Sequence, residues 1–255
     1  MRLATFNVNS IRRRLPHLLR FLSRRQPDLV MLQELKCRTE EFPAEEIAKA
    51  GYRSHALGQP GGRNGVAVVS RLPFAVVADR LPGEETDDAA RYLEVEVEGI
   101  RCAGIYLPNG NSGGEEGFAY KLRWMDRLRR LAADRLDSFL PFAILGDFNV
   151  CPTDADLAPG ALPPTDALVR PEARAAFRAL LHLGFTDALR ALHPEDAPYT
   201  YWDYGPAFET NRGLRIDHVL LSPELAERLV AAEVDVAARA EEQPSDHAPV
   251  IVTLR

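Results

Sequence analysis

The chain has 255 residues, of which 46% are hydrophobic and 27% charged, with a net charge of −6. This composition is typical of a soluble globular protein and argues against a disordered one. No apolar run approaches the ~18–20 residues of a membrane helix, and the first ten residues contain no signal stretch. We therefore expect neither membrane insertion nor secretion. Three widely separated cysteines, with no CxxC pair, are typical of a reducing cytoplasm, the expected location.

The basic residues are unusual, because 28 of the 31 are arginines. Arginine suits bidentate contact with phosphate, although a base-composition bias of the genome would explain the excess equally well. The negative net charge does not by itself indicate nucleic-acid binding. One face of a protein can nevertheless be basic while another is acidic.

The chain opens with a strand–helix–strand pattern. Residues 3–8 predict a strand, Pro16 can begin a helix, and Pro27 ends it. Residues 28–34 predict a buried strand that carries a carboxylate at its carboxyl end.

Apolar runs dominate the remainder of the chain. They predict further strands over residues 52–57, 66–70, 92–97, 101–107, 142–145, 215–221 and 250–254. Glu98 and Gly99 predict a tight hairpin turn between two of these strands.

Apolar residues at helical spacing predict helices over residues 117–139 and 171–183. Residues 151–170, rich in proline and aspartate, predict an ordered surface loop. Because no repeat, low-complexity tract or linker interrupts the chain, we expect a single domain over residues 1–255, with mixed sheets flanked by helices.

Polar and acidic side chains recur at the ends of these apolar runs. They are Asn7, Glu34, Tyr106, Asp147, Asn149, Asp217, Asp246 and His247. Each has an ordinary alternative role; Asp217, for example, could hold a backbone N–H or an arginine inside its apolar strand. Buried carboxylates are costly unless they are hydrogen-bonded or bind a metal. Converging strand ends would bring this set together.

This set of carboxylates, amides and one histidine contains no thiolate. Oxygen ligands suit Mg²⁺ or Mn²⁺ rather than Zn²⁺. The motifs of zinc proteases, P-loop nucleotide-binding proteins, dinucleotide-binding folds and serine hydrolases are absent. Residues 58–65 predict a flexible glycine-rich loop. The other histidines are expected at the surface or in packing.

Six motifs occur in an order and spacing that resemble a known family. They are FNVNSIR near the start, QELK at 33–36, YLPNG at 106–110, GDFN at 146–149, NRGLRID at 211–217 and SDHAP at 245–249. They are similar to those of the exonuclease III / AP endonuclease family, within the endonuclease–exonuclease–phosphatase superfamily, and span essentially the whole chain. The resemblance implies an α/β fold, a four-layer α/β/β/α sandwich of two packed mixed β-sheets flanked by helices.

The resemblance also implies a Mg²⁺-dependent DNA phosphodiesterase of base excision repair, with Mn²⁺ as a substitute. Such an enzyme cuts the backbone 5′ to abasic sites and has 3′–5′ exonuclease and 3′-end-trimming activity. The implied partner is double-stranded DNA with abasic sites or 3′ ends. We expect a cytoplasmic monomer that meets the nucleoid when acting on DNA.

The metal and the attacking water are assigned by the same resemblance. Glu34 corresponds to the main metal carboxylate, with Asn7 and Asp246 nearby. Asp147 corresponds to the residue that orients or deprotonates the water, and Asn149 assists it.

The resemblance assigns the phosphate and the sugar as well. His247, oriented by Asp217, would contact the scissile phosphate, and Tyr106 would hydrogen-bond the phosphate or the departing oxygen. Residues matching flanking phosphate contacts are Arg91, Asn109 and Lys121. Residues matching an apolar pocket for an extruded sugar are Tyr201, Leu214 and Ile216.

Two positions depart from the family pattern. Leu35 stands where threonine is common, and Leu214 stands where the human-type enzyme has tryptophan, as in the bacterial exonuclease III type. Two other readings remain open from the sequence. A small-molecule phosphatase or sphingomyelinase would share the acidic residues without needing Arg91 and Lys121. A non-catalytic binding module would have no use for so many costly carboxylates.

Overall fold

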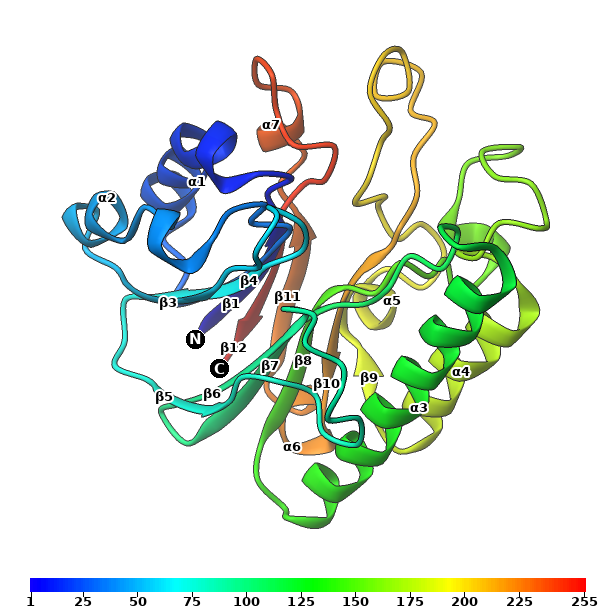
Figure 1. The fold of residues 1–255 in the computed structure, drawn as a ribbon, viewed down its shortest axis with the longest axis horizontal. Helices are drawn as coiled ribbons and strands as arrows, with labels where there is room; N and C mark the ends of the chain where they lie inside the picture. The colour runs from blue at the N-terminus through cyan, green and yellow to red at the C-terminus, as the bar shows by residue number, and fades with distance from the viewer.

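Two six-stranded sheets pack face to face in the computed structural model, which describes residues 1–255 (Figure 1). Helices α1 (Ile11–Arg25) and α2 (Ala44–Lys49) cover the outer face of one sheet. Helices α3 (Gly114–Asp137) and α4 (Pro171–His182) cover the outer face of the other. The expected four-layer α/β sandwich is thus confirmed. None of its helices combines the length and apolarity required to cross a membrane.

The first sheet brings both chain ends together. Its strands in spatial order are β11 (Leu229–Val234), β12 (Val250–Leu254), β1 (Arg2–Asn7), β2 (Leu29–Gln33), β4 (Val66–Ser70) and β3 (Arg53–Leu57). Strands β1 and β2 are parallel, and β12 runs antiparallel to β1. The carboxyl ends of β1 and β2 therefore lie at the same edge as the start of β12.

The second sheet repeats this arrangement. Its strands in spatial order are β5 (Ala75–Ala78), β6 (Tyr92–Val97), β7 (Ile100–Tyr106), β8 (Phe142–Asp147), β10 (Asp217–Leu221) and β9 (Thr186–Asp187). Because β7 and β8 are parallel and β10 is antiparallel to β8, both Tyr106 and Asp217 pair with Asp147 across neighbouring strands. The short helices are α5 (Ala188–Leu192), α6 (Pro223–Ala226), α7 (Val236–Arg239) and the 3-10 turns Thr39–Glu41 and Asp154–Asp156.

Strand alternation builds the layers. Along β1, Leu3 points between the sheets, whereas Ala4 and Phe6 pack outward against α1. Where the sheets meet, Gly104 lies so close to Met31 that an added Cβ would stand 2.7 Å from the methionine sulfur. A glycine at this point lets the two sheets approach.

The structure corrects the start of the first helix, which begins at Ile11 rather than at Pro16. The N–H groups of Ser10 and Ile11 bond to carbonyls of Glu34 and Leu35, and this fixes the start. Pro16 lies inside the helix on its exposed side.

Element boundaries elsewhere shift by a few residues, and the turn at Glu98 and Gly99 is confirmed by positive φ at both. The missed strands are short, or lie at a sheet edge and are largely exposed: β5, β9 and β11. β9 has only two residues, whereas β5 and β11 contain short apolar runs, AVVA and LVAA, that sequence reasoning missed.

The contact between the sheets yields a stability prediction. Gly104→Ala should lower the free energy of unfolding by about 1–3 kcal/mol, because the added methyl group overpacks a closed layer. Met31→Ala alone should also destabilise, but in the double variant it should relieve part of the strain. Denaturant unfolding of the four proteins checks this, and strictly additive losses would contradict the contact.

Candidate active site

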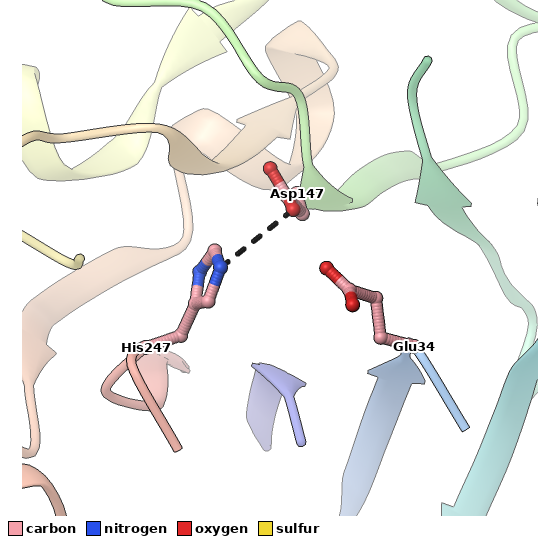
Figure 2. A group of neighbouring side chains, drawn as sticks. All are labelled: Glu34, Asp147 and His247. Carbon is pink, nitrogen blue, oxygen red and sulfur yellow. Dashed lines mark ion pairs between the residues drawn. The ribbon is translucent and has the colours of Figure 1, made fainter. Parts of the chain in front are cut away.

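Three ionisable side chains point toward one another where the sheet edges meet (Figure 2). Glu34 follows β2, Asp147 ends β8, and His247 precedes β12. One polar atom from each lies within 4.8 Å of the others. They line a cleft of about 750 Å³.

The GDFN segment fixes Asp147 by local geometry. Gly146 lies against β7 so closely that a Cβ would stand 2.0 Å from the Ile105 carbonyl oxygen, so only glycine fits. One carboxylate oxygen of Asp147 accepts the backbone N–H of Asn149 at 2.9 Å. The other accepts the side-chain amide of Asn7 at 2.9 Å. Asp147 is thereby held with almost no exposure to solvent.

Glu34 is held at a strained turn. Its φ of 52° is left-handed, and its carbonyl accepts the N–H of Ser10 at the start of α1. The carboxylate accepts hydrogen bonds from Asn7 at 2.9 Å and pairs with Lys36 at 2.8 Å. Burial raises the pKa of Glu34, but Lys36 and Asn7 outweigh burial, so the pKa lies below its usual value.

Asp217 and His247 form a buried ion pair. The Oδ2 atom of Asp217 lies 2.8 Å from Nδ1 of His247, and the opposite ring nitrogen lies 3.9 Å from Asp147. Burial alone would lower the pKa of His247, but the facing Asp217, followed by Asp147 and Asp246, raises it to about 10. The ring is therefore a cation at neutral pH.

The environment of Asp147 also raises a pKa, but for this carboxyl the favoured form is the neutral one. Burial raises its pKa, the carboxylates of Asp217 and Glu34 raise it further, and His247 only partly offsets them, so that it reaches about 7. This value suits a group that exchanges a proton near neutrality. Burial, with Glu34 and Asp147, likewise raises the pKa of the Tyr106 phenol, which therefore remains a hydrogen-bond donor.

Asp246 stands apart from the three converging atoms. Its carboxylate accepts the side-chain amide of Asn9 at 2.9 Å. The Asn9 oxygen in turn accepts from Lys36 at 2.5 Å. The expected metal group is therefore split: Asn7 touches Glu34, whereas Asp246 is linked through Asn9.

Arg91 and Asn109 lie beside the predicted catalytic residues. The Arg91 guanidinium stacks 4.6 Å from the centre of the Tyr106 ring and donates to the Tyr106 carbonyl. Asn109 is exposed on the rim, where its amide donates to the Asn149 side-chain oxygen at 3.0 Å. Asn149, which lines the cleft, also donates to the Leu107 carbonyl, and this leaves one of its two amide N–H groups free.

Lys121 differs from the expectation that it contacts a phosphate. It is completely buried, and its ammonium donates to the backbone carbonyls of Asn109, Asn149 and Ala167. Burial lowers the pKa of Lys121 to about 7, against the opposing effect of Asp147 and Asp166. In the protonated form all three N–H groups are used inside the protein, so none remains for DNA.

The three predicted pocket residues lie together. Tyr201 pairs with both Leu214 and His247 through isolated bridges, and its ring lies 5.0 Å from the imidazole. Leu214 and Ile216 are nearly buried in the cleft floor.

Sequence reasoning missed Thr200, whose buried hydroxyl accepts the N–H groups of Ile216 and Asp217. No motif marks it. It also missed Asn9, although Asn9 stands in the first quoted motif.

The chain is similar to known proteins over essentially its whole length. A model described as the Endonuclease/Exonuclease/phosphatase family matches residues 4–247. The chain belongs to this family. It is 34% identical to exodeoxyribonuclease III of Haemophilus influenzae, over 98% of both chains. The 3′ phosphatase NExo from Neisseria, bound to a product DNA hairpin, is 39% identical with a TM-score of 0.95, over 100% of this chain and 99% of that one.

A third relative is an AP endonuclease from Archaeoglobus fulgidus. It is 35% identical with a TM-score of 0.94, and the match covers 100% of this chain and 99% of that one. The family resemblance seen in the motifs is confirmed over the whole chain.

The donor set of this family member fits a hard divalent cation. Because His247 is protonated, the oxygens available to a cation are those of Glu34 and Asp147, and the Asn7 NH₂ group donates to both carboxylates. Two close carboxylates raise each other's cost of ionisation, and a cation would remove that cost. Metal dependence, typical of the family, therefore agrees with this acidic cluster.

The Asp217–His247 pair yields a titration prediction. In metal-free protein, His247 should stay protonated until the pH approaches about 10, and Asp217→Asn should lower its pKa by removing the facing charge. Because the folded pKa exceeds the ordinary value of 6.5, the pair should stabilise the fold fully below about pH 6.5. That contribution should disappear as the pH rises through about 10. NMR titration of the imidazole checks this, with half-buried His55 as the internal control.

Proposed function

We propose that this protein hydrolyses the DNA backbone on the 5′ side of abasic sites and also trims 3′ ends with 3′–5′ polarity. The observation that carries the proposal is the convergence of Glu34, Asp147 and His247 on one cleft floor, with Asp217 behind the histidine. The full-length similarity to exonuclease III and AP endonuclease members supports the same reaction. Neisseria NExo, a 3′ phosphatase, supports the 3′-end activity.

Asp147 serves as the proton acceptor for the attacking water. In the metal-free protein, burial together with Asp217 and Glu34 raises its pKa to about 7, so it accepts a proton more readily than an exposed aspartate would. Asn149 holds one oxygen of this carboxylate through its backbone N–H and offers its free amide N–H to a water or phosphate oxygen.

Charge that develops on the phosphate meets two fixed donors. The cationic His247 ring presents Nε2 on the same side as Asp147, and Tyr106 presents a protonated phenol. Preorganised donors of this kind contribute strongly to transition-state stabilisation. A Mg²⁺ ion, with Mn²⁺ as substitute, held by the Glu34 carboxylate would neutralise phosphate charge.

Despite the net charge of −6, a basic surface adjoins the cleft. A second cleft of about 730 Å³ is lined in part by Arg12, Arg13, Arg14 and Lys36. Tyr204 lines both clefts. Together with Arg91 and Asn109 beside Tyr106, this surface supplies the contacts that a DNA backbone needs.

The apolar floor supports selection of a base-free sugar. Tyr201, Leu214 and Ile216 offer no polar group able to read a base edge, apart from the tyrosine hydroxyl. Extrusion costs least where the base is already missing, so an abasic nucleotide enters most readily. We further propose that residues 1–255 form a single domain that acts as a monomer.

Two matched duplexes test the proposal. One carries a single abasic site and the other a recessed 3′ end, each incubated with Mg²⁺, Mn²⁺ or EDTA. We expect metal-dependent incision 5′ to the abasic site and shortening of the recessed end, and no cleavage in EDTA. Failure to cut either duplex with either metal would overturn the proposal.

Asp147→Asn should reduce abasic-site cleavage by on the order of 10²–10⁴-fold, because the proton acceptor is lost while the shape is kept. Binding of the abasic duplex should remain largely intact. Single-turnover cleavage and fluorescence anisotropy measure the two effects, and Asp79→Asn, an exposed carboxylate, serves as the control. Near-normal turnover by Asp147→Asn would remove this residue from the proton transfer.

Changing the size of the side chains in the cleft floor should shift substrate choice. Leu214→Trp should raise the ratio of abasic-site cleavage to 3′ digestion, because a larger ring closes on a base-free sugar and excludes a whole nucleotide. Tyr201→Ala should lower the same ratio. The measurement is the ratio of two rates on matched duplexes. An unchanged ratio in two folded variants would mean that these side chains do not form the sugar pocket.

A further inference from the structure

Lys121 occupies a position where a charge is costly. It lies on α3 among Phe118, Met125 and Leu128, and no part of it is exposed. The other two lysines of the chain, Lys36 and Lys49, both reach solvent. An apolar side chain would fill this site at lower cost, so the interactions of the ammonium must account for its presence.

The ammonium joins three segments of the cleft rim. It donates to the carbonyl of Asn109 at 3.0 Å, of Asn149 at 2.6 Å and of Ala167 at 3.1 Å. Asn109 follows β7, Asn149 follows β8, and Ala167 precedes α4. Three donors meet three acceptors, so the full valence of a protonated amine is satisfied.

The segment that Lys121 holds most closely carries a predicted catalytic residue. Asn149 has a left-handed φ of 49°, a conformation that asparagine adopts more readily than most non-glycine residues. Its N–H bonds to Asp147 and its side chain bonds to Leu107 and Asn109. Lys121 supplies the remaining bond, on the Asn149 carbonyl.

The neighbouring chain is shaped to admit this side chain. Gly110 has a φ of 89°, and a Cβ there would stand 2.7 Å from Cδ of Lys121 and 3.1 Å from Cβ of Ala167. A larger residue at Gly110 would therefore displace the lysine or the segment that it binds.

We propose that Lys121 is a positioning residue, which orients Asn149 and Asn109 toward the substrate by holding their backbone carbonyls. It does not contact DNA. The inference rests on the proposed DNA hydrolysis, because the effect of positioning is read in that reaction.

Lys121→Met keeps the length and apolar volume of the side chain but removes all three donors. We expect kcat to fall by about 10–100-fold, since small displacements of catalytic groups are expensive. KM should change by a smaller factor, because Arg91 and the basic cleft are untouched. Arg123→Met, an exposed position on the same helix, is the matched control and should keep both parameters. A kcat within twofold of the unsubstituted protein in a folded Lys121→Met would overturn the proposal.

A double-variant cycle separates positioning from general stability. If Lys121 acts through Asn149, then Lys121→Met should lower kcat by a much smaller factor in an Asn149→Ala background than in the unsubstituted protein. The proposal would be overturned if the double variant lost kcat by the full product of the two single factors.

Two further measurements decide the case if Lys121→Met does not fold. Gly110→Ala, on a partly exposed loop, should lower kcat by a larger factor than it weakens binding of the duplex. An unchanged kcat would overturn the proposal. In the unsubstituted protein, at a pH below the pKa of about 7 of Lys121, the ¹⁵Nζ resonance of one lysine should show slow proton exchange. Fast exchange at all three lysines would contradict the three hydrogen bonds of the Lys121 ammonium and overturn the proposal. Because this reading needs no cleavage, it stands apart from the duplex assay that tests the proposed function.

Discussion

Three carboxylates, those of Glu34, Asp147 and Asp217, meet where the edges of two packed sheets converge. Because they are shielded from water, their negative charges repel one another strongly, and the groups around them compensate that repulsion. Each is held by a different compensating group. His247 carries a positive charge against Asp217, Lys36 pairs with Glu34, and the Asn7 amide bridges Glu34 and Asp147. Asp147 receives the least compensation, so its proton affinity is the one that rises toward neutrality.

The sequence was sufficient to suggest the converging set, because its members lie at the ends of apolar strands, apart from Asp217, which was expected inside one. Parallel pairing of β1 with β2 and of β7 with β8 then brings those ends to one edge. Apart from the Asp217–His247 contact, which the family resemblance implied, the contacts between neighbouring side chains could not be predicted. Asp246 and Asn9 occupy quoted motifs, yet their mutual hydrogen bond depends on the path of two loops. Lys121 illustrates the same limit, because its acceptors are backbone carbonyls, which carry no signal in the sequence.

Not every buried charge in this chain serves chemistry, and the hydrogen bonding distinguishes the two kinds. Arg215 is as buried as Asp217 and only two residues away, but it is paired with both Asp156 and Asp187. His218 is likewise enclosed, with one ring nitrogen on Arg215 and the other on the Val150 carbonyl. These groups attach the 151–157 segment to β10. Asp217 instead leaves one oxygen without a partner, and Asp147 faces the cleft.

The rim of the cleft is joined to this charged floor at Asn9. Its side chain donates to the Tyr204 hydroxyl and also accepts from Lys36, which pairs with one of the three carboxylates. The bond from Arg212 to the Gly160 carbonyl, by contrast, involves none of the residues that hold the carboxylates. The sheet edges therefore fix the distances among the carboxylates, and rim segments such as the one at Gly160 can vary to set substrate choice.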